Sequence, residues 1–215
     1  MNRIVFPLLA RLTVLVAALL AGTLQIPSSI PQRVSPTENG AVQTSSRELI
    51  ALANFTQRVT NGDAGQIAGV YAMDVFALPV VQQPAGRPAY ISTQAGVLTE
   101  FSLAAPYGSL GFLAHNNLAG SLFQGLHPGN TLVVIFGDGA QGWYRIAKVR
   151  HFQAFDPTSP TSNYLDLEQG DHLTYTDLFQ QTYGQAGDVI LQTCISSGGI
   201  ESWGRLFVIA TPYTP

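Results

Sequence analysis

Three reactive side chains in this sequence stand where an apolar run meets a turn. Cys194, the only cysteine of the chain, ends the run DVILQTC, Arg205 begins the run RLFVIAT, and His115 ends the run SLGFLAH. A side chain at a strand end is held by rigid backbone and still faces an opening. Together the three could carry out acyl transfer, in which the thiol attacks a carbonyl, the guanidinium donates to the developing oxyanion, and the imidazole protonates the departing amine.

Each of these residues also has a structural interpretation. Cys194 could be a small buried hydrophobe, and Arg205 could be an edge charge whose guanidinium reaches solvent. The other histidines, His127, His151 and His172, have no metal-ligand spacing with one another or with the cysteine. We therefore expect structural or solvated roles for them and no zinc site.

Short strands are the elements that would position the three reactive residues. After Gly65, apolar or alternating runs such as GVLTEFSLA and TLVVIFG are separated by turn residues, with no long helical period between them. This spacing is typical of an antiparallel barrel or sandwich. The predicted fold class is therefore all-β, with an antiparallel β-barrel over residues 65–215.

Two helices are predicted beside the strands. Ser45 and Glu48 have capping-box spacing ahead of an apolar face, which predicts one N-terminal helix over residues 45–64. A long break between the last strands, residues 156–187, contains TYTDLFQQTYG, which predicts a short helix capped by Thr176. A loop of this length on a compact barrel usually carries function or covers something.

Composition argues against nucleic acid as a partner. The chain of 215 residues has a net charge of −3 and no lysine or arginine run, so it lacks the electrostatic footprint of a protein that binds a polyanion. Residues 137–142 match G-x-G-x-x-G, but a strand pattern follows them, so no helix N-terminus is available for a pyrophosphate. We interpret this motif as a hairpin turn.

The N-terminus predicts export. Arg3 and Arg11 flank or precede an uncharged apolar stretch, so residues 1–26 are expected to be a cleaved signal or a retained membrane anchor with its N-terminus inside. Residues 27–44, rich in Pro, Ser and Thr, are expected to be an extended linker. The domain would then work outside the cytoplasm, where proteins seldom keep an idle thiol, and this favours a function for Cys194.

The residues around the thiol resemble a known family. Papain-like peptidases place Cys before His, and caspase-like enzymes need Q-A-C-[RQG]-G, so neither fits. Ile190–Cys194 (ILQTC), Trp203–Ala210 (WGRLFVIA) and the segment GFLAHNNLAGSLFQGLHPGNTLVVI resemble the sortases, membrane-anchored cysteine transpeptidases of bacterial surfaces. Two departures are Ile190, where the family hallmark begins with Thr, and Ala114, where the family usually has Gly before its histidine.

The resemblance implies a sortase-like barrel and a role for each reactive residue. Cys194 would be the nucleophile, His115 the general acid and base, and Arg205 the stabiliser of oxyanion and substrate. The residues implied in substrate binding are Thr193, Ala114 and Trp203. The implied partners are proteins with a C-terminal LPxTG-like sorting signal and an amine acceptor such as a cell-wall precursor or a pilin lysine.

The resemblance leaves some alternatives open. A hydrolysing cysteine peptidase, or an inactive surface barrel that binds peptide or a cell-wall ligand, would share the same fold. No cofactor is implied, although some sortases bind calcium near the long loop. Asp166, Glu168 and Asp171 could be calcium ligands, or they could form a solvated acidic loop.

Overall fold

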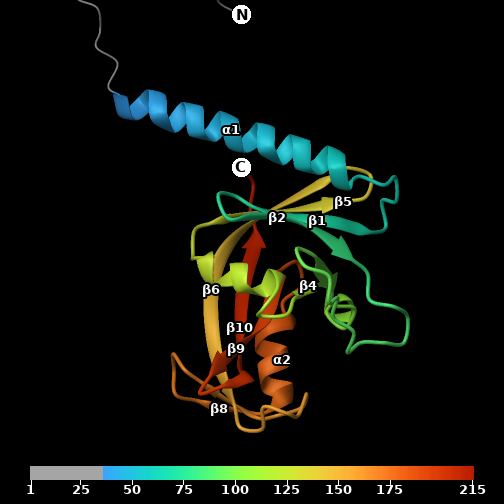
Figure 1. Ribbon diagram of the computed structural model, residues 1–215, viewed down its shortest axis with the longest axis vertical. Helices are drawn as coiled ribbons and strands as arrows, with labels where there is room; N and C mark the ends of the chain where they lie inside the picture. The colour runs from blue at the N-terminus through green and yellow to red at the C-terminus, as the bar shows by residue number, and fades with distance from the viewer. Residues whose placement is uncertain (1–35) are drawn as a thin grey trace, which may run out of the picture.

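The strands hydrogen-bond side by side into a closed ring (Figure 1). The computed structural model describes residues 36–215, with side chains from residue 45 onward. Around the ring the order is β10, β9, β4, β3, β2, β1, β5 and β6, and β6 then pairs with β10 to close it. The ring strands are β1 Ile67–Ala72, β2 Phe76–Val81, β3 Leu98–Glu100, β4 Leu110–Leu113, β5 Thr131–Phe136, β6 Gln141–Ala154, β9 Val189–Ser197 and β10 Ile200–Pro212. Two further strands, β7 Tyr164–Asp166 and β8 His172–Leu173, extend the sheet from β6.

The predicted all-β barrel is confirmed, but its strand pairing is mixed. The pairs β2–β3 and β4–β9 are parallel, whereas the other pairings are antiparallel. Parallel neighbours need a crossover connection, and the alternation of side chains within a run does not record which strand it will join. The sequence patterns therefore predicted the barrel and missed these two pairings.

Alternation along the last two strands divides their side chains between two cores. Leu191 and Val208 point into the ring, where they are fully buried with other aliphatic and aromatic side chains. Ile190 and Phe207 point outward and are buried in a second cluster beneath the long connection between β6 and β9. Because side chains two residues apart share a face of a strand, Cys194 belongs to the outward face with Ile190.

The N-terminal helix is longer than predicted and begins earlier. α1 spans Pro36–Val59, whereas we expected a helix over 45–64 after an extended linker at 27–44. Proline is well suited to the first helical position because its missing N–H is not needed there, so the helix can begin at Pro36. The capping-box pair at Ser45 and Glu48 lies inside the helix and does not mark its start.

α1 packs on the barrel through a few apolar side chains. Leu52 and Phe55 are buried against β1 and β5, in a cluster with Tyr71 and Val133. A Cβ at Gly69 would lie 2.8 Å from the Phe55 ring, so a glycine is needed there for the helix to approach. Within the part of the chain that the structure describes, no helix is both long and apolar enough to cross a membrane. The predicted signal or anchor at 1–26 lies outside the described residues.

The connection between β6 and β9 contains the predicted short helix. α2 spans Tyr175–Tyr183, and its N-cap is Thr174 and not Thr176 as we predicted. The reason is a capping box, in which the Thr174 hydroxyl accepts from the Asp177 N–H and the Asp177 carboxylate accepts from Thr174. Two short 3-10 helices, η1 Ala105–Tyr107 and η2 Ala119–Gly125, complete the described elements.

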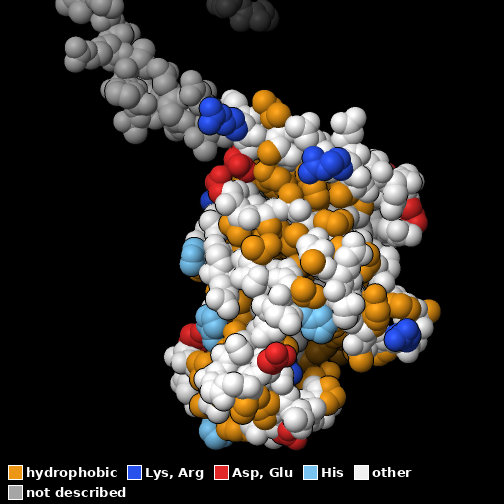
Figure 2. All heavy atoms as spheres, in the orientation of Figure 1, with side chains coloured by type: hydrophobic (Ala, Val, Ile, Leu, Met, Phe, Trp, Pro, Cys, Tyr) orange, Lys and Arg blue, Asp and Glu red, His pale blue; other side chains and the backbone are white. Residues whose placement is uncertain are grey.

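The G-x-G-x-x-G motif forms a hairpin turn, as predicted. It joins the antiparallel strands β5 and β6, and the Phe136 N–H donates to the Ala140 carbonyl across the turn. On the face shown in Figure 2, lysine and arginine side chains are few and scattered among hydrophobic ones.

Candidate active site

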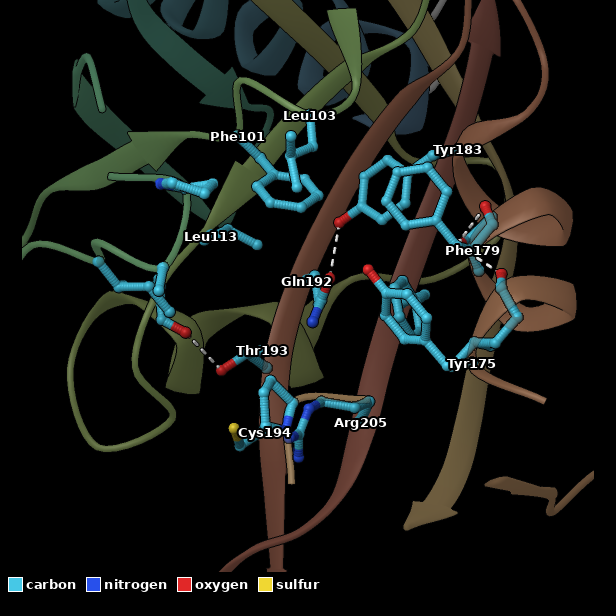
Figure 3. Close-up of a pocket in the computed structure, with 18 of the residues that line it drawn as sticks. Phe101, Leu103, Leu113, Tyr175, Phe179, Tyr183, Gln192, Thr193, Cys194 and Arg205 are labelled. Atoms are coloured by element: carbon cyan, nitrogen blue, oxygen red, sulfur yellow. Dashed lines mark hydrogen bonds between the residues drawn. The ribbon is translucent and has the colours of Figure 1, made fainter. Parts of the chain in front are cut away.

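Strand pairing places Cys194 opposite Arg205. The two residues are direct cross-strand partners in the antiparallel pair β9–β10. Directly opposite residues on one face of an antiparallel pair have Cβ atoms about 4.5 to 5.5 Å apart. Both side chains are half-buried, and Figure 3 shows them together at one end of a pocket. The thiol and the guanidinium therefore share one surface because of the barrel register.

The parallel pair β4–β9 brings His115 to the same place. Leu113 at the end of β4 is the partner of Gln192, and the Ala114 N–H donates to the Gln192 carbonyl at 3.3 Å. The Thr193 hydroxyl, which is buried, donates to the Ala114 carbonyl at 2.9 Å. These bonds fix the two residues that precede His115 and Cys194, so the histidine lies at the level of the thiol.

A tight loop after His115 holds its backbone. The His115 carbonyl accepts from the N–H groups of Leu118 and Gly120, both at 3.0 Å. A Cβ at Gly120 would lie 2.2 Å from the Thr193 hydroxyl oxygen and 2.8 Å from the His115 carbonyl oxygen. The loop can therefore pass this close to β9 only because residue 120 is a glycine.

The Arg205 guanidinium is oriented by backbone carbonyls. Its Nη1 donates to the Ser202 carbonyl at 3.0 Å and to the Gly204 carbonyl at 2.9 Å. Its Nε and Nη2 have no partner among the described residues, so three N–H donors remain available. Gly204 lets β10 lie between its two neighbours, since a Cβ there would be 2.3 Å from the Phe152 carbonyl oxygen.

The three reactive side chains line one cavity of about 360 Å³. Aromatic rings form much of the remaining lining, and Figure 3 labels Phe101, Tyr175, Phe179 and Tyr183 among them. Tyr164 also lines the cavity. Among the described residues that line this cavity, none carries a carboxylate, so the fixed charge is the Arg205 guanidinium. A negative charge that developed on a ligand here would meet a cation in mainly apolar surroundings, where it interacts more strongly than in water.

Tyr164 is close to both members of the cross-strand pair. Burial raises the pKa of its phenol, the positive charge of Arg205 works against that rise, and Cys194 adds to it. The hydroxyl is therefore a neutral group beside the thiol and the guanidinium. Sequence reasoning missed this residue because it stands in the long connection, far from the three runs that carry the reactive side chains.

Of the residues expected in substrate binding, two lie at the cavity and one does not. Ala114 and Thr193 line it, whereas Trp203 is half-buried on β10 outside its lining. The expectation for Trp203 came from its place in the Arg205 segment. The register of β10 against β9 shifts between Ile200 and Gly204, so regular alternation cannot be extended from Arg205 back to Trp203.

Two of the three acidic residues considered as calcium ligands have side-chain partners in the protein, and the third, Asp171, is exposed. Asp166 is buried, and its carboxylate pairs with Arg150. Burial alone would raise the pKa of Asp166, but the N–H groups of Gln169 and Glu168, together with Arg150, hold it below its ordinary value. Glu168 lies 2.7 Å from the His151 Nδ1. Among the described residues, no group of three or more His, Cys, Asp or Glu side chains is placed to hold a metal ion.

The other histidines lie away from the cavity. His127 is exposed in the turn between η2 and β5, and the His172 ring packs against Phe155 in a tilted arrangement with centroids 5.1 Å apart. His151 pairs with Glu168 as described above, and none of the three lines the cavity.

The similarities to known proteins concern the fold. Neither a protein-family model nor a curated protein matches the chain. Among solved structures, sortase A from Listeria monocytogenes has 12% identity, covers 71% of this chain and 89% of its own, and has a TM-score of 0.43. Sortase C1 from Streptococcus agalactiae, in complex with MTSET, has 14% identity, covers 85% of this chain and 93% of its own, and has a TM-score of 0.44. At identities of this level the likeness is one of fold alone, so the function must come from the site.

Proposed function

We propose that the protein is a cysteine transpeptidase of the sortase type, with Cys194 as nucleophile, His115 as general acid and base, and Arg205 as oxyanion donor. The observation that carries this proposal is the cross-strand pairing of Cys194 with Arg205, at the end of a cavity that His115 also lines. A buried structural thiol would not need a guanidinium with unused donors directly opposite. An edge arginine would turn toward solvent instead of lining a cavity.

The first half of the reaction forms a thioester. The Cys194 sulfur, as thiolate, attacks the carbonyl carbon of a peptide bond, and the negative charge moves to the carbonyl oxygen. The Nε and Nη2 donors of Arg205 are free to bind that oxygen while its Nη1 stays on backbone carbonyls. The carbon–nitrogen bond then breaks, and protonated His115 gives its proton to the departing amine.

The second half transfers the acyl group. A primary amine attacks the thioester carbonyl carbon, His115 accepts a proton from the attacking nitrogen, and the thiolate of Cys194 leaves. The product is a new amide, and the Cys194 thiolate and the protonated His115 are regenerated. Water attacking in place of the amine would give a free acid, so partition between the two products separates a transpeptidase from a hydrolase.

The proposed substrates are proteins that end in an LPxTG-like sorting signal, and the proposed acceptor is an amine of a cell-wall precursor or a pilin lysine. We also propose that the protein works at the outer face of the cell membrane. The basis is the sequence of the first 26 residues, in which two arginines accompany an uncharged apolar stretch.

Mass spectrometry of the full-length protein with a library of peptides related to L-P-x-T-G tests this function. We expect a thioester on Cys194, and we expect added triglycine to divert the product from free acid to a new amide. His115→Ala should lose the thioester, because no group then protonates the departing amine. His127→Ala is the matched control, since that exposed imidazole lies outside the cavity, and it should keep full activity.

Two results would contradict the proposal in different ways. Absence of a thioester across the whole library, with Cys194 unreactive toward small thiol reagents, would favour the inactive peptide-binding barrel. A thioester that yields only free acid, whatever amine is added, would favour the hydrolase.

A further inference from the structure

We infer that the side-chain amide of Gln192 is a substrate-binding donor, which holds a backbone carbonyl of the acyl peptide two residues before the carbonyl that Cys194 attacks. This inference rests on the proposed function and deepens it by adding a residue that selects an extended peptide backbone. Gln192 lies on β9 between the reactive end of the cavity and its aromatic end, and it lines the cavity (Figure 3).

The orientation of the Gln192 amide is fixed by one hydrogen bond. Its Oε1 accepts from the Tyr183 hydroxyl at 2.7 Å. Its Nε2 has no partner among the described residues, and both N–H groups of that nitrogen can donate. A polar side chain on an otherwise apolar outward face, with its acceptor occupied and its donors unused, is suited to bind a carbonyl oxygen.

Tyr183 is built to remain the donor in this bond. The residue is 2% exposed, and its ring packs against Phe179 with centroids 4.9 Å apart and against Phe101 at 5.2 Å. Its backbone carbonyl accepts from the Ser109 hydroxyl at 2.8 Å. Burial raises the pKa of the Tyr183 phenol well above its ordinary value, so the hydroxyl keeps its proton and the amide keeps its orientation.

The spacing along β9 matches the repeat of an extended peptide. Gln192 and Cys194 are two residues apart on one face of the strand, which corresponds to about 6.5 to 7 Å. Alternate carbonyls of an extended peptide have the same separation. A peptide whose reacting carbonyl lies at Cys194, and whose acyl part runs along β9 toward the aromatic wall, therefore places its next carbonyl of the same orientation at Gln192.

The acyl part is the segment that this arrangement would hold. In a transfer reaction the leaving amine must depart and an acceptor must enter, while the acyl part stays attached to Cys194. An enclosed wall of rings and a fixed amide donor are useful for the part that stays. The ligand class is thus an extended peptide recognised through its backbone carbonyl as well as through apolar side chains.

Affinity labelling of the full-length protein tests the inference without requiring turnover. The probe is N-acetyl-Leu-Pro-Ala-Thr chloromethyl ketone, in which the Cys194 sulfur displaces chloride. In three analogues, each amide bond between two residues of the probe is in turn replaced by an (E)-alkene, which removes the carbonyl. Matching esters remove only an N–H where the bond has one. We expect one alkene, at the carbonyl two residues before the ketone, to slow labelling of the wild type by about 3- to 10-fold, the usual size of one neutral hydrogen bond.

Variants then assign that loss to Gln192. Gln192→Leu should label at the same rate with the amide and alkene probes, because it has no donor to lose. Tyr183→Phe should show a reduced ratio between the two probes, and adding it to Gln192→Leu should change the ratio no further. Tyr175→Phe is the matched control, because its ring lines the same cavity and its hydroxyl has no partner among the described residues. It should keep the wild-type ratio.

An unfolded chain would also label at one rate with both probes, so labelling of Gln192→Leu by the amide probe must remain faster than labelling of the same variant in denaturant. An unchanged amide-to-alkene ratio in Gln192→Leu would overturn the inference while leaving Cys194 reactive. Failure of every probe to label Cys194 in the wild type would instead count against the proposed function.

Discussion

Two cavities among the described residues differ in how their polar atoms are used. The larger, of about 580 Å³, lies between α1 and the β1–β2 hairpin, and the smaller, of about 360 Å³, holds Cys194, His115 and Arg205. In the larger cavity the Glu48 carboxylate accepts from the Tyr71 hydroxyl at 2.8 Å and from the Asp74 N–H at 3.3 Å. In the smaller cavity several donors have no partner among the described residues.

This difference distinguishes a cavity that serves the packing of α1 from a cavity that can bind a ligand. Burial, together with the bond to Glu48, raises the pKa of Tyr71 to about 12, so its hydroxyl remains a donor that ties α1 to the barrel. The polar groups there serve the packing of a helix. In the other cavity Arg205 and Gln192 are each oriented by protein contacts that occupy only part of their hydrogen-bonding capacity. Unused and oriented donors, more than volume, mark the cavity that can bind a ligand.

Replacing the arginine of each cavity by lysine should give the largest difference in turnover between the two cavities. Arg205→Lys removes the planar set of donors, and we expect turnover to fall by about 10²- to 10³-fold, the usual cost of one oxyanion donor. Arg58→Lys, at the edge of the larger cavity, should leave turnover unchanged within experimental error. Steady-state transpeptidation by both variants measures the contrast, and survival of Arg205→Lys within a few-fold of wild type would make Arg205 an edge charge.

Adding a methyl group at the glycine where each region packs most closely should have a smaller effect on activity. Gly120→Ala forces apart the His115 loop and Thr193, and we expect it to cost about 1 to 3 kcal/mol of unfolding free energy and to slow acylation. Gly69→Ala pushes on the Phe55 ring beneath α1, so it should lower stability with little change in acylation per folded molecule. Denaturant melts and labelling of Cys194 report the two quantities, and equal loss of acylation in both variants would show that the regions are not independent.

The smallest effect should come from the paired carboxylates of the larger cavity. The negative charge of Glu48, with some burial, raises the pKa of Asp74 above its ordinary value of 3.8. A raised carboxyl pKa means that the ionised group costs stability at neutral pH, and that this cost is relieved as pH falls through the raised value toward 3.8. Asp74→Asn should therefore raise the melting temperature by about 1 °C at pH 7 and not at pH 4, because both carboxylates reach solvent.

Asparagine also tolerates the positive φ of 62° at this position, so the change adds no backbone strain. Asp171→Asn is the control, since its side chain is exposed, and its melting temperature should follow the wild type at both pH values. A gain for Asp74→Asn that is the same at both pH values would rule out charge repulsion as its cause.

Local patterns predicted the elements of this fold better than their partners. Alternation and turn residues located the strands and the barrel, because a strand with one buried face alternates apolar and polar residues along the sequence. The parallel pairing of β4 with β9, which brings His115 to Cys194, joins distant runs, and nothing in either run specifies the other. Without the family resemblance, the sequence patterns allowed the three reactive strand ends to share a site but did not predict that they would.

Some details of the site did have a local signal that could have been used. Gln192 is a polar residue in the run DVILQTC, and it shares the strand face of Cys194 through the two-residue period. That position alone would have marked it as a residue of the same surface. Tyr183 and Tyr164 carried no comparable signal, because they lie on α2 and β7 in the connection between β6 and β9, whose path depends on tertiary packing.

The pairings of β9 also set the order in which the site can be assembled. β9 and β10 are a hairpin of neighbouring segments, so the thiol and the guanidinium can meet through short-range contacts. His115 joins them only when β4 docks alongside β9, a long-range contact with a greater loop-closure cost. During refolding, reactivity that depends on His115 should therefore appear no earlier than the β4–β9 pairing, so the chemistry itself would report when that pair of strands has joined.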